Sequence, residues 1–375
     1  MITSELYPVF SGGMGRAVYE IANSLGKRGV GVTVLIPQLG WKGDLNRNVK
    51  VVEVPFRLAY GVYDISWDEY YYDLERRDEV MKFNRIFKKV AEGIDFDVIH
   101  VHDWMNIPAG ILIRRSTGKP LVVHIHSTEY DRTNDNPRPW VVDLEREGMQ
   151  EADAVVVTSR YTKQQLVSRY GIDPSKIHVA YNGINPARFN RKIGGVKKPG
   201  DKVVLFVGRL TVQKGLWHLL QAAREVILRD PSVRFVIIGS GPDMVHLINL
   251  SIDLGIADKV IFTGRIPDEE LLAAYRVADV FVMPSVSEPF GIVALEAMAA
   301  GKPVIVSKSS GVAEVVHNCF KVDFWDIELM ASRILEVLHY KPLAEVMGHN
   351  GKREVMHLGW DNTASKVLKV YRRLL

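Results

Sequence analysis

The chain has 375 residues, 47% of them hydrophobic and 25% charged, which excludes an intrinsically disordered protein and predicts two folded domains. Its formal net charge of +4 is too small for a nucleic-acid-binding protein, which would carry clustered Lys and Arg. A single cysteine, Cys319, excludes a disulfide framework and is typical of a reducing compartment.

The sequence also argues against a membrane protein. It contains no apolar run of the ~18 residues that a membrane span requires. Its first residues, with Glu5 among them, lack the basic and then apolar pattern of a secretory signal. We therefore expect a cytoplasmic protein with no transmembrane segment. The opening strand at residues 1–4 is very short, so whether the natural start is complete stays open.

The chain opens with a strand, a glycine turn and a helix. Gly12 and Gly13 precede a helix predicted over residues 16–28. This layout is typical of a loop that approaches a phosphate group, but its spacing fits neither the dinucleotide fingerprint nor the P-loop. A simple tight turn explains the two glycines equally well.

Aromatic side chains are concentrated in residues 60–72. These are Tyr60, Tyr63, Trp67, Tyr70, Tyr71 and Tyr72. Aromatic faces bind the C–H surface of sugar rings while their polar tips stay hydrated. The segment is therefore a candidate sugar-binding loop, and a loop packed by its own aromatic residues is the alternative. A helix predicted over residues 76–92 carries an apolar face that we assign to the core.

Two buried strands end in polar residues. Residues 97–102 lead into Asp103, and residues 121–125 lead into His126. Ligands of open α/β sheets gather outside the carboxyl ends of the strands, so both residues are candidate site residues.

A metal site is one alternative at these two strands. Each strand carries two histidines on one face, His100 with His102 and His124 with His126, and imidazole is a common zinc ligand. The apolar residues between them place His100 and His124 in the protein interior, so we expect no metal there.

A second series of strands and helices begins after a linker at residues 192–202. Its strands are predicted at 203–207, 233–238, 259–262, 280–283 and 303–306. Strands that alternate with helices indicate a parallel sheet covered by helices on both faces. Four of the five strands are followed by glycine or charged residues, which chance packing would not arrange. Two such units favour two facing doubly wound domains with the site in the cleft between them.

The stretch from Ser285 to Ile305 has the most specific pattern in the chain. It is typical of a strand, a loop, a helix that starts near Gly291, and another strand. The unpaired amides at the start of a helix form an anion site. Glu288 and Glu296 flank this start, eight positions apart. A sugar attached to a diphosphate satisfies both the amides and the carboxylates.

These residues resemble the GT-B-fold retaining glycosyltransferases of family 4 and the related glycogen and starch synthases. The resemblance extends over nearly the whole chain. It is most specific in the segment from Glu288 to Glu296, which leads into Ala-Met-Ala-Ala-Gly-Lys-Pro-Val-Ile. It implies an α/β protein with two Rossmann-like parallel-sheet domains. Residues 1–185, with a C-terminal crossover helix at 360–375, would bind the acceptor, and residues 200–355 would bind the nucleotide sugar.

The resemblance also implies a role for each candidate residue. His126 and Glu288 would contact the donor sugar, and Arg209 and Lys214 would clamp its diphosphate. The other implied donor-binding residues are Gly12, Gly13 and Asp103, then Gly239, Arg265 and Ile266, and finally Phe290, Gly291, Ile292 and Val293 at the distal phosphate and Glu296 at the ribose.

Two departures from the bacterial glycogen synthases limit this resemblance. Those enzymes have Lys-Thr before the two glycines, where this chain has Ser11 and no lysine. Their His-Asp-Trp-His motif ends here in Met105. Both departures weaken a specific assignment to glycogen synthase and leave the broader transferase assignment intact.

The expected activity is transfer of a hexosyl group, in our interpretation glucosyl, with retention of the anomeric configuration. The donor would be a UDP-, ADP- or GDP-sugar and the acceptor a sugar or a glucan. Cations and helix amides would neutralise the diphosphate, so we expect no metal and no other cofactor. Two alternatives stay open: a nucleotide-sugar epimerase or hydrolase on the same fold, and a binding protein without catalysis.

Overall fold

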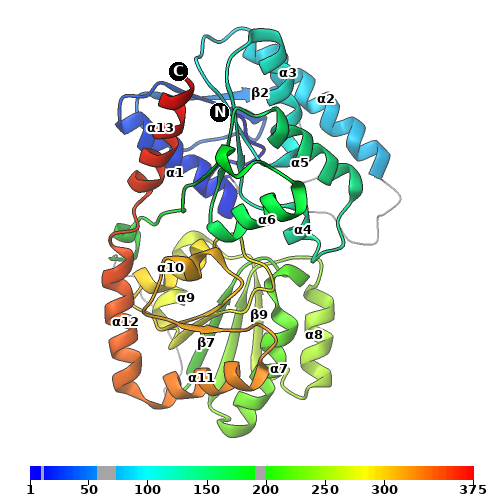
Figure 1. The fold of residues 1–375 in the computed structure, drawn as a ribbon. Helices are drawn as coiled ribbons and strands as arrows, with labels where there is room; N and C mark the ends of the chain where they lie inside the picture. Colours follow the sequence, from blue (N-terminus) through cyan, green and yellow to red (C-terminus); the bar gives the residue numbers. More distant parts are fainter. Residues whose placement is uncertain (10–11, 57–72, 191–199) are drawn as a thin grey trace. The chain divides into compact units, whose positions relative to one another are not determined.

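The structure is a computed structural model that describes residues 1–9, 12–56, 73–190 and 200–375. The chain forms two compact units (Figure 1). Unit 1 contains Met1–Gly183 together with Trp360–Leu375, and unit 2 contains Ile184–Gly359. Each unit is built on a parallel sheet, so the predicted pair of doubly wound, Rossmann-like α/β folds is confirmed.

The strands of unit 1 all run parallel. They are β1 (Val32–Pro37), β2 (Val49–Val54), β3 (Ile99–His102), β4 (Leu121–Ile125), β5 (Ala154–Val157) and β6 (Ile177–Val179). Ile2 forms parallel bridges to Leu35 of β1 and to Val101 of β3, and thereby joins β2-β1 to β3-β4-β5-β6. The opening strand expected at residues 1–4 is reduced to this one bridging residue. The short β6 had not been predicted.

Seven helices of unit 1 lie within the described residues. They are α1 (Gly13–Lys27), α2 (Asp73–Ala91), α3 (Ile107–Thr117), α4 (Glu129–Arg132), α5 (Pro139–Glu151), α6 (Arg160–Tyr170) and α13 (Trp360–Leu374). Helix α1 begins three residues before the predicted start, because tertiary burial of its first turn outweighs the low helix propensity of glycine. The C-terminal helix α13 packs against α1, and its Thr363 hydroxyl donates to the Tyr181 carbonyl at 2.6 Å.

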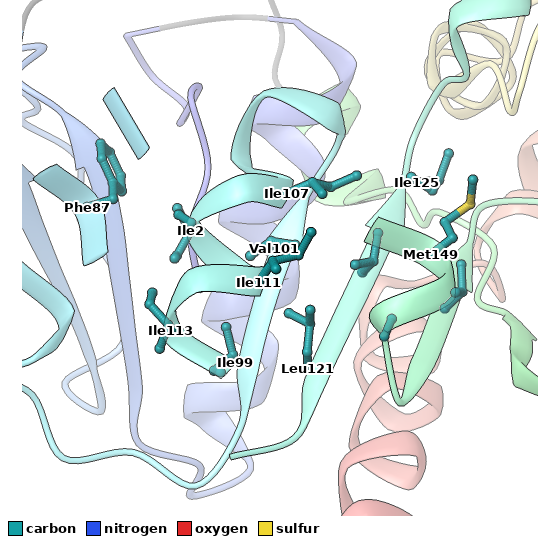
Figure 2. Close-up of a cluster of buried hydrophobic side chains, with 14 of the residues drawn as sticks. Ile2, Phe87, Ile99, Val101, Ile107, Ile111, Ile113, Leu121, Ile125 and Met149 are labelled. Atoms are coloured by element: carbon teal, nitrogen blue, oxygen red, sulfur yellow. The ribbon is translucent and has the colours of Figure 1, made fainter. Parts of the chain in front are cut away.

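The core of unit 1 forms between its sheet and the helices that cover it. Ile99 and Val101 of β3 and Leu121 of β4 lie toward α3, whereas Ile125 of β4 lies beside Met149 of α5, as Figure 2 shows. Helix α2 packs against α3, and its Phe83 and Phe87 are fully buried, which confirms that this helix faces the core. The strand positions between these apolar residues include His100, His102 and His124, which are discussed below with His126.

Unit 2 has six parallel strands. They are β7 (Lys202–Val207), β8 (Val233–Ile238), β9 (Val260–Gly264), β10 (Val280–Met283), β11 (Val304–Ser307) and β12 (Phe320–Val322). Their order across the sheet is β12-β11-β10-β7-β8-β9. The chain therefore moves outward from β7 in one direction and then returns to extend the sheet from β10 in the other. The direction reverses between β7 and β10, which is the topological switch point of a doubly wound sheet.

Helices connect the strands of unit 2. They are α7 (Leu216–Arg229), α8 (Met244–Asp253), α9 (Asp268–Val277), α10 (Ile292–Ala299), α11 (Ile327–His339) and α12 (Lys341–Val355). Right-handed crossovers place α7 and α8 on one face of the sheet and α9 and α10 on the other. Helix α11 packs against α7, and α12 packs against α10. Helices α11 and α12 and strand β12 were not predicted. Across the described residues, no helix is both long and apolar enough to cross a membrane.

Candidate active site

The candidate site in unit 2 lies where β7 and β10 end side by side. The loop Gly208–Gly215 follows β7, and the loop from Pro284 to Phe290 follows β10. Because the strand order reverses between these two strands, a ligand of this sheet is expected at this edge.

Two glycines allow the strand-exit loops to pack backbone against backbone. Gly215 has φ +67°, and a Cβ atom there would lie 2.0 Å from the Pro284 carbonyl oxygen. Gly239, at the end of β8, has φ +137°, and its Cβ would lie 1.8 Å from the Gly208 carbonyl oxygen. Only glycine fits at such positions. Through these contacts the loop after β7 packs against the loops after β8 and β10.

Lys214 and Glu288 form an ion pair across the switch point. The Lys214 Nζ atom lies 2.6 Å from Glu288 Oε2, and the Ser285 hydroxyl donates to the same oxygen at 3.2 Å. Both side chains are largely buried, with 17% and 10% of their surface exposed. The structure therefore brings together two residues that are 74 positions apart and were both predicted to act on the donor.

Helix α10 begins directly beside this pair. Gly291 caps its start with φ +105°, and the Met283 side chain fills the space that a Cβ atom would need. The first-turn amides at Ile292 and Val293 have no partner inside the helix. Phe290, the residue before the cap, is buried and fixed through its carbonyl oxygen, which accepts from the Val312 amide at 2.7 Å. This arrangement can bind an anion in the predicted place.

The carboxylate of Glu296, in α10, is bound by two residues from outside this helix that the sequence did not predict. Its Oε2 accepts from the Tyr275 hydroxyl at 3.0 Å, and its Oε1 lies 3.9 Å from Arg188 Nη1. Arg188 also donates to Asp268 at 2.9 Å. No local spacing could have shown these contacts, because Tyr275 and Arg188 come from α9 and from the chain before β7.

The two predicted arginines lie at different strands of the same edge. Arg209 follows β7 after Gly208 and is half-buried. Arg265 and Ile266 follow β9, two strands away from β7, and the Arg265 side chain is exposed. The structure thus brings Lys214 and Glu288 into direct contact, while the loop that carries Arg265 leaves the sheet further along its edge.

Unit 1 has a second group of candidate residues where β3 and β4 end. Asp103 has φ +56°, and its Oδ1 accepts from the backbone amides of His126 at 2.6 Å and Ser127 at 3.4 Å. Burial raises the pKa of Asp103 to about 6, although Arg132 and these amides favour its charged form. Asp103 thus fixes the backbone at His126, so the structure brings these two predicted residues together.

A buried network of charges follows His126 and was missed from the sequence. Arg132 donates to Glu145 at 2.5 Å, to Glu129 at 3.1 Å and to the Ser127 carbonyl at 2.6 Å. Glu129 also accepts from Arg138 at 2.6 Å, and Glu145 accepts from the Tyr170 hydroxyl. Burial raises the pKa of Glu145 to about 7, against the effect of Arg132.

One local signal for this network was present in the sequence. Thr128 and Asp131 form a capping box, in which each side chain bonds to the backbone amide of the other. Thr-x-x-Asp is close to the usual capping-box pattern and indicates a helix start at residue 129. The pattern predicts the short helix, but it does not predict that Arg138 and Glu145 bind the charged residues of that helix.

The four histidines form one buried cluster on neighbouring strands. His102 is the register partner of His124, and the rings stack along each strand at 4.3 Å for His100 with His102 and 4.2 Å for His124 with His126. Ring nitrogens of His100, His102 and His124 lie within 4.8 Å of one another, close enough to be considered as metal ligands. Histidines that bind a metal are themselves neutral imidazoles, so this geometry does not test the expectation that the cluster holds no metal, which stays a prediction.

Burial of this cluster predicts a loss of stability in acid. Burial lowers the pKa of each of the four imidazoles, that of His126 to about 3. Below pH 6.5 the unfolded chain binds protons that the folded chain does not, so the free energy of unfolding should fall as the pH drops from 6.5 toward 3. Each histidine contributes up to about 1.4 kcal/mol per pH unit.

Urea unfolding between pH 7 and pH 5 tests this prediction against the variant His124→Leu. In the variant, the free energy of unfolding should change less steeply with pH, by up to about 1.4 kcal/mol per pH unit, the contribution of one histidine. The raised pKa values of Asp103 and Glu145 act in the opposite sense but are common to both proteins. Equal slopes for the two proteins would contradict the prediction.

The glycine turn of unit 1 lies over a buried carboxylate. Gly12 and Gly13 are exposed; Gly12 caps the start of α1, and Gly13 is the first residue of the helix. A Cβ atom at Gly12 would lie 3.2 Å from Glu5 Oε2, and Glu5 itself is fully buried. Glu5 had been considered only for its charge near the chain start. The aromatic segment at residues 60–72 and the linker residues 191–199 lie outside the described residues.

Comparison with protein families matches the two halves of the chain to two domains. Residues 11–188 match the model described as Glycosyltransferase Family 4, and residues 188–354 match Glycosyl transferases group 1. An uncharacterised glycosyltransferase of Methanocaldococcus jannaschii is 33% identical over 391 residues, which cover 99% of this chain and 97% of that protein.

Solved structures share the fold. A sucrose-phosphate synthase from Thermosynechococcus elongatus superposes with a TM-score of 0.82 at 23% identity, covering 100% of this chain and 98% of that one. The catalytic domain of starch synthase IV from Arabidopsis thaliana, bound to ADP and acarbose, gives a TM-score of 0.75 at 19% identity, with coverage of 100% and 98%.

Proposed function

Because this chain is a family 4 glycosyltransferase with the GT-B fold, we propose that it transfers a hexosyl group from a nucleotide diphosphate sugar to a hydroxyl group of a sugar or glucan. We assign a glucosyl group and retention of the anomeric configuration on the resemblance to glycogen and starch synthases. The starch synthase bound to ADP and acarbose supports a nucleotide donor and a glucan-like acceptor.

The observation that carries the proposal is the Lys214–Glu288 pair at the switch point. A cation, a carboxylate and the start of α10 meet at one edge, where Lys214 and Glu288 are 2.6 Å apart. A sugar diphosphate has anionic oxygens for the lysine and the amides, and hydroxyl groups for the carboxylate. In the absence of substrate, Lys214 and Glu288 neutralise each other.

The proposed reaction breaks the bond between the anomeric carbon and the diphosphate oxygen and forms a bond from that carbon to the acceptor oxygen. Negative charge grows on the leaving diphosphate, so fixed cations and amides stabilise the transition state. We assign this task to Arg209, Lys214 and the first turn of α10. Glu288 and His126 orient the sugar, and Glu296 binds the ribose. The departing phosphate accepts the proton of the acceptor hydroxyl.

A donor screen tests the proposed function. Purified protein is mixed with UDP-, ADP- and GDP-sugars, and nucleotide release is measured with and without glucose, maltose or a longer glucan. Release that requires an acceptor, with an α-linked product in the anomeric NMR signals, is the expected result. Release without any acceptor would indicate a hydrolase, a changed sugar without release would indicate an epimerase, and saturable binding without turnover would indicate a binding protein. Each of these outcomes contradicts the proposal.

Catalysis is expected to be independent of metal ions. Lys214 and the amides of α10 already supply the positive charge that a metal would bring to the diphosphate. Transfer rates before and after treatment with EDTA should therefore agree within about twofold. Loss of activity on chelation and its recovery with Mn²⁺ or Zn²⁺ would refute this prediction.

A further inference from the structure

His126 is held in place by three contacts, one at its backbone and two at its ring. Its backbone amide donates to Asp103 Oδ1 at 2.6 Å. Its ring stacks on His124 at 4.2 Å, with an angle of 16° between the ring planes. Its Nε2 lies 3.0 Å from Nδ1 of His102. One ring nitrogen of His126, Nδ1, is therefore left for a ligand, and His126 is also the most exposed of the four histidines, at 9%.

The bond between His102 and His126 requires one proton between two nitrogens. Either His102 Nδ1 carries the proton and donates it, or His126 Nε2 does. Burial lowers the pKa of both imidazoles, so both are neutral and each ring carries a single proton. The choice at this bond therefore determines which nitrogen of His126 is protonated.

The far nitrogen of His102 distinguishes the two arrangements. His102 Nε2 is buried and has no hydrogen-bond partner among the described residues. If His126 donated, that nitrogen would carry a buried N–H without an acceptor. If His102 donates, the same nitrogen is a bare acceptor. By analogy with the backbone, orphaned buried N–H groups are the rarer of the two.

We propose that His102 is a positioning residue that donates from Nδ1 to His126 and so holds His126 in the tautomer protonated on Nδ1. His126 then presents a neutral N–H donor toward the ligand. Under the proposed function, this donor binds a hydroxyl oxygen of the transferred sugar and does not act as a base. The inferred role of His126 in transfer rests on the proposed function, whereas its tautomer does not.

Nitrogen NMR of protein labelled with ¹⁵N-histidine tests the tautomer directly, with the His126 signals identified by their absence in His126→Gln. The wild type should show His126 protonated on Nδ1. His102→Asn should preserve this tautomer, because the amide nitrogen of asparagine donates from nearly the same place. His102→Leu should lose it. Wild-type protein with the proton on Nε2, or with a metal-shifted nitrogen in the cluster, would overturn the proposal whatever the enzyme transfers.

Kinetics then separate positioning from a merely structural effect. His102→Leu should lower kcat by about 3- to 10-fold, the effect of one misdirected neutral hydrogen bond, with the donor KM unchanged within about twofold. His102→Asn should restore kcat. His178→Leu on β6 is the matched control and should leave kcat unchanged. If His102→Asn loses as much activity as His102→Leu while His126 keeps its tautomer, the positioning role is wrong.

Discussion

Replacing Lys214 by alanine is expected to lower kcat by about 10² to 10³, which corresponds to ~2.7–4 kcal/mol of transition-state stabilisation. The lysine is held 2.6 Å from Glu288 at the switch point, so its charge is in place before the reaction begins. Negative charge on the leaving diphosphate is greatest in the transition state. Since only interactions that strengthen toward the transition state raise kcat, the loss should appear in kcat more than in donor KM.

Glu296→Gln is the informative comparison for Lys214→Ala. Glu296 would bind the ribose equally before and during the reaction, so its variant should mainly raise the donor KM, by ~1–3 kcal/mol in binding. Lys259→Ala is the control: this lysine lies at the amino end of β9, and in the described structure its side chain bonds only to the Pro231 carbonyl. Its removal should change neither kcat nor the donor KM. The reverse pattern for Lys214 and Glu296 would show that their roles are exchanged. If neither variant affected turnover, this edge of the sheet would not be the active site.

Local patterns predicted much of unit 2, because its strands are apolar runs that end in glycine or charge. The helix start near Gly291 was predicted from small residues and an apolar strand before it, and α10 indeed begins at Ile292 with Gly291 as its cap. The order of the strands could not be obtained in this way. It is the order that places the loop after β7 beside the loop after β10, and so brings Lys214 to Glu288.

Contacts between distant segments account for what the sequence did not show. Tyr275 and Arg188 reach Glu296 from other parts of unit 2, and Tyr371 of α13 bonds to His100 Nδ1 at 2.6 Å across 271 positions. Polar side chains such as these look like ordinary surface residues in a sequence. Burial gives them their importance, and burial depends on packing between elements that a periodicity within one element does not describe.

The second large effect is expected for Arg132→Met, which should lower the free energy of unfolding by about 3–5 kcal/mol. Removing one partner of a buried ion pair leaves the other charge buried without compensation. Arg132 has 15% of its side chain exposed, and its partners Glu129 and Glu145 have 0% and 1%. Arg138 still reaches Glu129 in the variant, but Glu145 keeps only neutral donors such as the Tyr170 hydroxyl. Urea unfolding at pH 8 measures the loss.

The same network allows two controls that separate buried charge from lost packing. Arg115→Met removes an exposed arginine, 56% accessible, that also pairs with two glutamates, and it should cost less than about 1 kcal/mol. Adding Glu145→Gln to Arg132→Met should recover part of the loss, since the stranded charge is then absent. The deficit should also shrink as the pH falls toward 7 and stay level below it. Arg132 lowers the pKa of Glu145 to about 7 in the wild type, so without Arg132 this carboxyl takes up its proton at a higher pH and becomes neutral. An Arg132→Met deficit that is as small as that of Arg115→Met, or that neither a fall in pH toward 7 nor Glu145→Gln reduces, would show that the buried charges do not hold the segment after His126 in place.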